Sequence, residues 1–178
     1  LQQAQAEPGV NFLGIEWEYQ YYAYAADRIR RVNLTNARML HANAVDFLRW
    51  RVPDNVIRVL HLYFSDPWPK AKHHKNRVVQ DRFLGDAYRT LRPGGELRIV
   101  TDHAEYWVWM QEHFARWTIG AAGASAGVGG MAHPLFEAHA FDPPRSAGEG
   151  ELVGTNFERK YRLEGRPFNA ITLRKPGA

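Results

Sequence analysis

The chain has 178 residues, of which 45% are hydrophobic and 24% are charged, and both values are ordinary for one globular domain. Lys and Arg outnumber Asp and Glu by 23 to 19, so the net charge of +4 permits a polyanionic partner without requiring one. The absence of cysteine excludes a disulfide framework, a thiolate nucleophile and a cysteine-based zinc site, and no apolar run is long enough for a membrane span.

The first third of the chain alternates short apolar runs with segments of helical spacing. The run VIRVLHLYF is the strongest strand pattern, because it is β-branched and aromatic and is apolar on both faces in its second half. The predicted strands are Asn11–Glu16, Ala37–His41 and Val56–Phe64. The predicted helices are 1–6, Glu18–Val32 and Ala44–Val52.

The remainder continues the alternation after a proline-rich loop over Ser65–Asn76. We expect a flexible insertion over residues 118–150, because its Gly- and Ala-rich part at 120–130 lacks side chains for packing. The predicted helices are Val78–Leu91, which is followed by an Arg92–Gly95 stop, and His103–Trp117. The predicted strands are Glu96–Val100, Phe157–Leu163 and Phe168–Leu173.

This order predicts an α/β domain with a mostly parallel sheet and helices on both faces. Ligands of such sheets bind beyond the carboxyl ends of the strands. An acidic residue follows three of the apolar runs, and these are Glu16, Asp66 and Asp102.

Glu16 and Asn43 each allow a structural and a functional interpretation. A carboxylate at the end of a strand can accept hydrogen bonds from both hydroxyls of a ribose, or it can cap the helix that follows. Asn43 can cap the next helix, and its amide can also bind the edge of an adenine.

The stretch Ser65–Lys70 is the most informative part of the sequence, because two prolines fix the backbone around Asp66 and Trp68 directly after a strand. It is either a structural turn or a rigid binding loop. A one-signed cluster of cations follows, which favours phosphate binding. Its members are Lys70, Lys72, Lys75, Arg77 and Arg82, with Asp81 as the acid among them.

No metal site is predicted, because His73 and His74 are adjacent and are surrounded by cations. Asp102 is either the N-cap of the helix that follows it or a ligand-binding acid. The run Thr155–Glu158 is either a helix start or the entrance to a strand.

Taken together, these motifs resemble the bacterial tRNA (guanine-N7-)-methyltransferases, which use S-adenosyl-L-methionine. The most specific match is FSDPWPKAKHHKNR at Phe64–Arg77. The other matches are FLGIE at Phe12–Glu16, NAVDFL at Asn43–Leu48, PDN at Pro53–Asn55, LRPGGELRIVTD at Leu91–Asp102 and TNFERK at Thr155–Lys160.

The resemblance implies a Rossmann-like fold with an antiparallel strand near the C-terminus, and methylation of guanosine N7 in the tRNA variable loop at position 46. It assigns Glu16, Asn43 and Asp66 to the cofactor and gives Asp66 the catalytic role. It assigns Lys70, Asp102, Thr155, Asn156, Phe157 and Glu158 to substrate binding, and we add Lys72, Lys75 and Arg77 as contacts to the RNA backbone.

The resemblance also implies that a first strand and a glycine-rich cofactor loop precede Leu1, so we expect residues 1–178 to be one N-terminally incomplete methyltransferase domain. The expected protein is cytoplasmic, binds tRNA and no membrane, and is a monomer or homodimer. Two alternatives stay open at this point. The methyl acceptor could be another RNA position, such as an exocyclic amine, or the protein could be a non-catalytic RNA-binding module.

Overall fold

The residues described by the computed structural model, 1–118 and 136–177, divide into two units. The first unit comprises Leu1–Arg51 and Pro143–Glu158, and the second comprises Val52–Asp142 and Arg159–Ala178. The glycine-rich segment at 120–130, which we predicted to be flexible, lies outside the described residues. The expectation of one domain over residues 1–178 stays a prediction.

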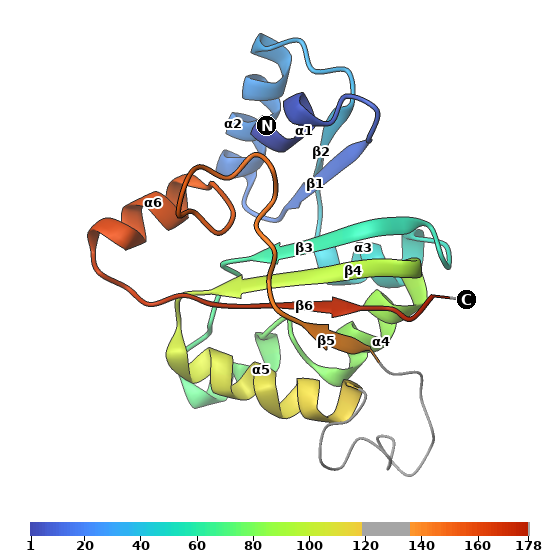
Figure 1. Ribbon diagram of the computed structural model, residues 1–178, viewed down its shortest axis with the longest axis vertical. Coiled ribbons are helices and arrows are strands. Elements are labelled where there is room, and N and C mark those ends of the chain that lie inside the picture. Colours follow the sequence, from blue (N-terminus) through green and yellow to red (C-terminus); the bar gives the residue numbers. More distant parts are fainter. Residues whose placement is uncertain (119–135, 178) are drawn as a thin grey trace. The chain divides into compact units, whose positions relative to one another are not determined.

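The sheet of the first unit consists of two parallel strands joined through a helix (Figure 1). The strands pair in register from Phe12 opposite Ala37 to Glu16 opposite His41, so both carboxyl ends lie at one edge. The intervening helix packs against both strands, as a parallel crossover requires. The elements are α1 (Gln2–Ala6), β1 (Phe12–Glu16), α2 (Tyr19–Arg31), β2 (Ala37–His41) and α3 (Ala44–Arg51).

The second unit contains a four-stranded sheet with the order β3-β4-β6-β5. Strands β3 and β4 are parallel, and β6 runs antiparallel to both β4 and β5. The strands are β3 (Ile57–Tyr63), β4 (Leu91–Thr101), β5 (Glu137–His139) and β6 (Asn169–Arg174). The helices are α4 (Asp81–Thr90), α5 (Ala104–Trp117) and the 3-10 helix η1 (Ala71–Asn76). Residues of both units contribute to α6 (Asn156–Leu163).

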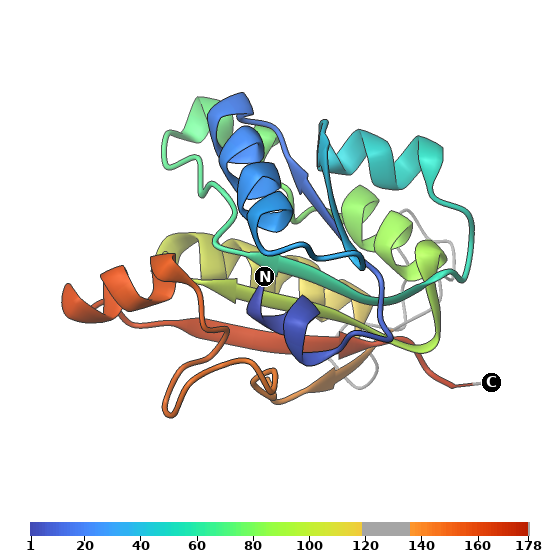
Figure 2. The ribbon, with the colours of Figure 1, turned by 90° about the horizontal axis from the view of Figure 1, so that it is seen from above.

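The core of the second unit lies between its sheet and the pair α4 and α5 (Figure 2). Alternate residues of β4, Leu97 and Ile99, are fully buried, because side chains along a strand point to opposite faces in turn. Leu84 of α4 and Met110 of α5 are also fully buried. This packing fixes the carboxyl ends of β3 and β4, where the loops of interest begin.

The α/β class and the antiparallel strand near the C-terminus are confirmed, but three local predictions need correction. Residues 157–163 form helix α6, because the Thr155 hydroxyl accepts the Glu158 backbone N–H at 3.1 Å and starts a helix. The helix before residues 92–95 ends at Thr90, as the predicted stop requires, but the strand that follows begins at Leu91 and not at Glu96, and residues 92–95 form an irregular part of it. Part of the predicted insertion, 137–139, is strand β5. In the described residues, we find no helix with the length and apolar character of a membrane span.

Candidate functional site

The predicted cofactor residues Glu16 and Asn43 lie at one sheet edge of the first unit. Glu16 ends β1 opposite His41, which ends β2, and Asn43 follows two residues later. The Glu16 carboxylate accepts the Glu18 backbone N–H at 2.8 Å, immediately before α2. Glu16 is not the N-cap of α2, because that position is occupied by Glu18 and has no side-chain cap hydrogen bond. The contact with the Glu18 N–H orients the half-buried Glu16 carboxylate without covering it.

Asn43 caps α3, as its structural interpretation predicts. Its Oδ1 accepts the backbone N–H groups of Val45 at 2.9 Å and Asp46 at 3.2 Å. The cap uses only the oxygen of the amide, and the side chain is exposed. The amide NH₂ group is the part that a ligand at this edge could use as a hydrogen-bond donor.

The loop after β3 places Asp66 between two strained aromatic residues of the second unit. Phe64 and Trp68 have φ angles of +55° and +44°, in the left-handed region that bulky side chains rarely adopt. Each such residue costs about 1–3 kcal/mol and persists only where the surroundings enforce it. The Trp68 backbone N–H donates to Asp66 Oδ1 at 3.1 Å, and the Asp66 side chain is exposed. The loop therefore holds an accessible carboxylate in a fixed orientation.

Arg77 anchors this loop from inside the unit. Its side chain is 0% exposed, and its Nε donates to the Pro67 carbonyl at 2.9 Å. Its Nη2 donates to both carboxylate oxygens of Glu105 in α5, at 3.0 and 2.8 Å. The guanidinium carbon also lies 5.2 Å and 5.0 Å from the ring centres of Tyr106 and Trp109.

The burial of Arg77 corrects the prediction that it contacts the RNA backbone, because a phosphate outside the protein cannot reach it. Lys70, Lys72 and Lys75 are exposed, as a phosphate-binding cluster requires. The ring of Trp68 stacks on His73 of η1, with ring centres 5.7 Å apart. The predicted cation cluster therefore has two structural roles. Arg77 is an internal anchor, and Lys70, Lys72 and Lys75 form an external basic surface.

Asp102 lies at the same edge of the second sheet as Asp66. Tyr63 is opposite Val100 in the parallel pair of β3 and β4, so the segments that carry the two acids start side by side. Asp102 is not the N-cap of α5, since His103 Nδ1 accepts the Tyr106 backbone N–H at 3.3 Å. Asp102 instead accepts a hydrogen bond from Arg166 at 2.8 Å.

Glu158 is the clearest correction to the predicted substrate contacts. It is 0% exposed, and its carboxylate accepts the backbone N–H groups of Leu152, Val153 and Gly154 at 2.5, 2.8 and 3.0 Å. Its oxygens therefore hold the loop before α6 and cannot also select a guanine. The Thr155 hydroxyl is similarly used as the helix cap, whereas the Asn156 and Phe157 side chains are exposed.

Two residues of this region were missed by the sequence reasoning, namely Glu105 and Arg166. The hydrogen bond from Arg77 holds the pKa of Glu105 below its usual value. Arg166 pairs with Asp102 and, at 2.7 Å, with Glu164. The predicted helix His103–Trp117 includes Glu105 in its first turn, but no local pattern indicated the partner of Glu105, which lies 28 residues away.

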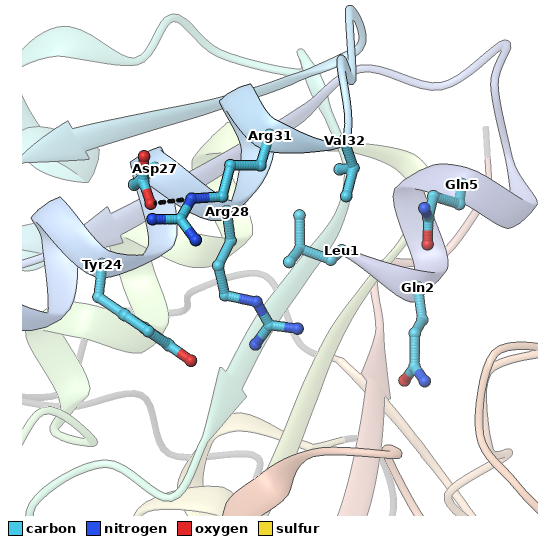
Figure 3. A pocket seen from close by; sticks show the side chains of 8 residues that line it. All are labelled: Leu1, Gln2, Gln5, Tyr24, Asp27, Arg28, Arg31 and Val32. Atoms are coloured by element: carbon cyan, nitrogen blue, oxygen red, sulfur yellow. Dashed lines mark ion pairs between the residues drawn. The ribbon is translucent and has the colours of Figure 1, made fainter.

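A cavity of about 400 Å³ lies between α1 and α2 of the first unit (Figure 3). Its wall includes Tyr24, Arg28 and the pair of Asp27 and Arg31, whose Oδ2 and Nε atoms are 2.6 Å apart. None of the predicted site residues lines it. The candidate functional residues lie instead at one edge of the sheet in each unit, Glu16 and Asn43 in the first and Asp66 and Asp102 in the second.

Known proteins are similar to this chain in sequence and in fold. A tRNA (guanine-N(7)-)-methyltransferase of Nocardia farcinica is 41% identical over 119 residues, which cover 67% of this chain and 42% of that protein. The enzyme of the same name from Alcanivorax borkumensis is 36% identical over 159 residues, covering 89% of this chain and 60% of that protein. The chain thus spans about half the length of these curated relatives.

Solved structures with the same fold are far more distant in sequence. The tRNA (m1A58) methyltransferase TrmI from Aquifex aeolicus has a TM-score of 0.52 at 13% identity, with 94% of this chain and 54% of that chain covered. An rRNA methylase from Streptococcus thermophilus has a TM-score of 0.51 at 14% identity, with 93% and 74% covered. These likenesses identify the Rossmann-like fold of the methyltransferases.

The comparison with family models covers more than half of the chain. The model described as "Putative methyltransferase" matches residues 1–119, which include Glu16, Asn43, the Asp66 loop and Asp102. This match and the curated relatives confirm the resemblance that the motifs indicated. The chain belongs to this family of methyltransferases.

Proposed function

We propose that this chain is part of an enzyme that transfers a methyl group from S-adenosyl-L-methionine to N7 of a guanosine in the tRNA variable loop, at position 46. The observation that carries the proposal is the Asp66 loop, where a strained and anchored backbone presents an exposed acid next to a basic surface. The activity for which the curated relatives are named supports the choice of tRNA and of N7. Because tRNA is the proposed substrate, we also propose a cytoplasmic enzyme.

Methylation of N7 requires the enzyme to position the guanine against the methyl group more than to transfer a proton. Guanine N7 carries a free lone pair, so no base has to remove a proton before it attacks a methyl group. Methylation puts positive charge on the guanine ring, and a carboxylate held beside the ring stabilises that charge as it develops. Asp66 suits this role because its loop is fixed before the substrate arrives.

The residues of the first unit fit the cofactor. Glu16 offers a carboxylate, oriented by the Glu18 N–H, for the hydroxyls of a ribose. Asn43 offers its amide NH₂ to an adenine edge while its oxygen caps α3. When bound, S-adenosyl-L-methionine supplies a methyl group on a positively charged sulfur.

The substrate would be held by the second unit. Asp102 Oδ2 is paired with Arg166, and the remaining oxygen can accept a hydrogen bond from N1–H or N2–H₂ of a guanine. Exposed Lys70, Lys72 and Lys75 would contact the phosphates around the target nucleotide. The target base has to leave its stacked position to reach an acid at the sheet edge.

The direct test replaces Asp66 in the full-length protein and measures methyl transfer to tRNA. We expect Asp66→Asn to lower kcat by about 10²-fold or more, with the Kd for tRNA nearly unchanged. Asp142→Asn, which makes the same change at an exposed aspartate of the second unit, is the matched control. Nucleoside analysis should yield N7-methylguanosine, and a tRNA with adenosine at position 46 should stay unmethylated.

Two results would contradict the proposal. If Asp66→Asn turns over like the control, the acid is not catalytic. If the product carries its methyl group on an exocyclic amine, the chemistry is that of a different methyltransferase class. A wild-type protein that binds tRNA but yields no methylated nucleoside would indicate a non-catalytic RNA-binding module.

A further inference from the structure

We propose that the exposed side of α6 is a second contact for the tRNA backbone, separate from Lys70, Lys72 and Lys75, which lie at the start of η1 and within it and are called here the η1 lysines. This inference rests on the proposed function, since it names a further surface for the same substrate. The surface is defined here as the α6 basic face, which consists of Arg159, Lys160 and Arg162. All three residues belong to the second unit, as does the Asp66 loop.

The charge of this segment is strongly one-sided. Residues 159–166 contain four cations and one acid, Glu164. That acid pairs with Arg166, the cation that also binds Asp102. Arg159, Lys160 and Arg162 are all exposed, whereas Glu158 and Tyr161 of the same helix are fully buried and half-buried, respectively. Arg162 follows Glu158 by one helical turn, so the three cations occupy a broad exposed arc of α6.

Aromatic packing connects the α6 basic face to the loop of the proposed catalytic acid. The ring of Phe64, two residues before Asp66, lies 6.1 Å from the Tyr161 ring and 5.8 Å from the Phe168 ring. Lys160 Nζ is 5.9 Å from the Tyr161 ring centre, and the Arg162 guanidinium is 5.5 Å from that of Phe168. These contacts hold the cations close to the edge where the target base would enter.

The end of the α6 segment is also fixed at that edge. Asn169, the first residue of β6, is opposite Thr101, the last residue of β4. Arg166 reaches Asp102 next to it, and its guanidinium carbon lies 4.1 Å from the Tyr161 ring centre. A polynucleotide with one base at Asp66 extends in both directions from that nucleotide. The η1 lysines and the α6 basic face offer it two groups of cations at the same end of the sheet.

Phosphate is the ligand chemistry that this surface fits. Exposed Lys and Arg side chains bind phosphate oxygens without reading the base, and each contact releases counterions from the nucleic acid. The contribution of the α6 basic face is therefore visible as a salt dependence of tRNA binding. If α6 were an ordinary solvated helix, removing its charges would leave the salt dependence of tRNA binding unchanged.

The experiment measures tRNA binding by the full-length protein at several KCl concentrations. Lys160→Gln with Arg162→Gln keeps part of each aliphatic stem and removes both charges. We expect the slope of log K against log[KCl] to become shallower by about 1.5, and the affinity at 0.1 M KCl to fall about tenfold or more. Arg51→Gln with Arg92→Gln removes two exposed arginine charges elsewhere and should change the slope little.

Further variants separate a charge effect from a loss of folding. Lys160→Arg with Arg162→Lys preserves the charges and should keep the wild-type slope. The single variant Lys160→Gln should show about half of the effect of the double variant. If the α6 basic face and the η1 lysines hold separate phosphates, adding Lys70→Ala and Lys72→Ala should change the slope by the sum of the two effects.

The outcomes distinguish this inference from the proposed function. A wild-type protein that neither binds nor methylates tRNA would refute the proposed function itself. A wild-type protein that methylates tRNA, together with a Lys160→Gln and Arg162→Gln variant that keeps its slope and affinity, would overturn only the assignment of the α6 basic face.

Discussion

Replacing Arg77 by methionine tests whether the buried guanidinium, and not the proline-rich sequence alone, holds the Asp66 loop. Methionine keeps an unbranched side chain but removes the donor to the Pro67 carbonyl and the pair with Glu105. The perturbation therefore acts on the anchor without touching the proposed catalytic acid.

The expected loss of stability follows from the contacts of the guanidinium. A hydrogen bond to a charged group contributes about 1.5–3 kcal/mol, and this value applies to the bond to the Pro67 carbonyl. The pair with Glu105 adds only about 0–1 kcal/mol, because the Glu105 side chain is 54% exposed and screened by water. Removing a buried charge recovers part of its desolvation free energy. We therefore expect a net loss of about 2 kcal/mol in the free energy of unfolding.

The effect on catalysis should be larger than the effect on folding. Without the anchor, the left-handed backbone of Phe64 and Trp68 can relax and carry Asp66 away from its working position. A displacement of about 1 Å lowers the rate by about 10²-fold. We expect kcat to fall by that factor while KM for tRNA changes little, because the exposed lysines are untouched.

Urea denaturation followed by tryptophan fluorescence measures the stability, and methyl transfer under saturating tRNA measures kcat. Arg77→Lys, which keeps the charge and one donor nitrogen, should restore part of kcat. If folded Arg77→Met keeps the wild-type kcat, the loop does not depend on this anchor and the reasoning is refuted.

Three further predictions concern stability. Glu158→Ala leaves three backbone N–H groups without their acceptor, so it should cost about 3 kcal/mol or more in urea denaturation, and a loss near zero would contradict the burial of the carboxylate. Gly95→Ala brings Cβ to 2.8 Å from the Arg92 carbonyl and should cost about 2 kcal/mol, whereas Gly177→Ala, with nothing within 4 Å, should be neutral. Arg77 lowers the pKa of Glu105 from 4.5, so the ion pair contributes its full stabilisation above about pH 4.5 and loses it as the pH falls through the lowered pKa. Glu105→Gln should therefore weaken the dependence of the free energy of unfolding on pH in the acidic range. If that dependence is unchanged, the pair of Arg77 and Glu105 is not its source.

The sequence by itself determined the order of the elements from β1 to α5 and the carboxyl ends of the strands that carry Glu16, Asp66 and Asp102. β2 occupies the predicted residues, and β1, α2, α3 and β3 agree within one or two positions. Local periodicity suffices for this, because strands and helices differ in the spacing of their apolar side chains. The rule that ligands bind at the carboxyl ends of strands then selected Glu16, Asp66 and Asp102.

Only the tertiary structure decided what each charged side chain does. Arg77 and Lys75 are two residues apart in one basic run, yet Arg77 is buried against Glu105 and Lys75 is exposed. Glu158 is acidic like Asp66, yet it is fully enclosed by backbone N–H groups. Whether an ionisable group is buried or exposed depends on the partners that offset its desolvation free energy. Those partners come from distant parts of the chain, which no local pattern specifies.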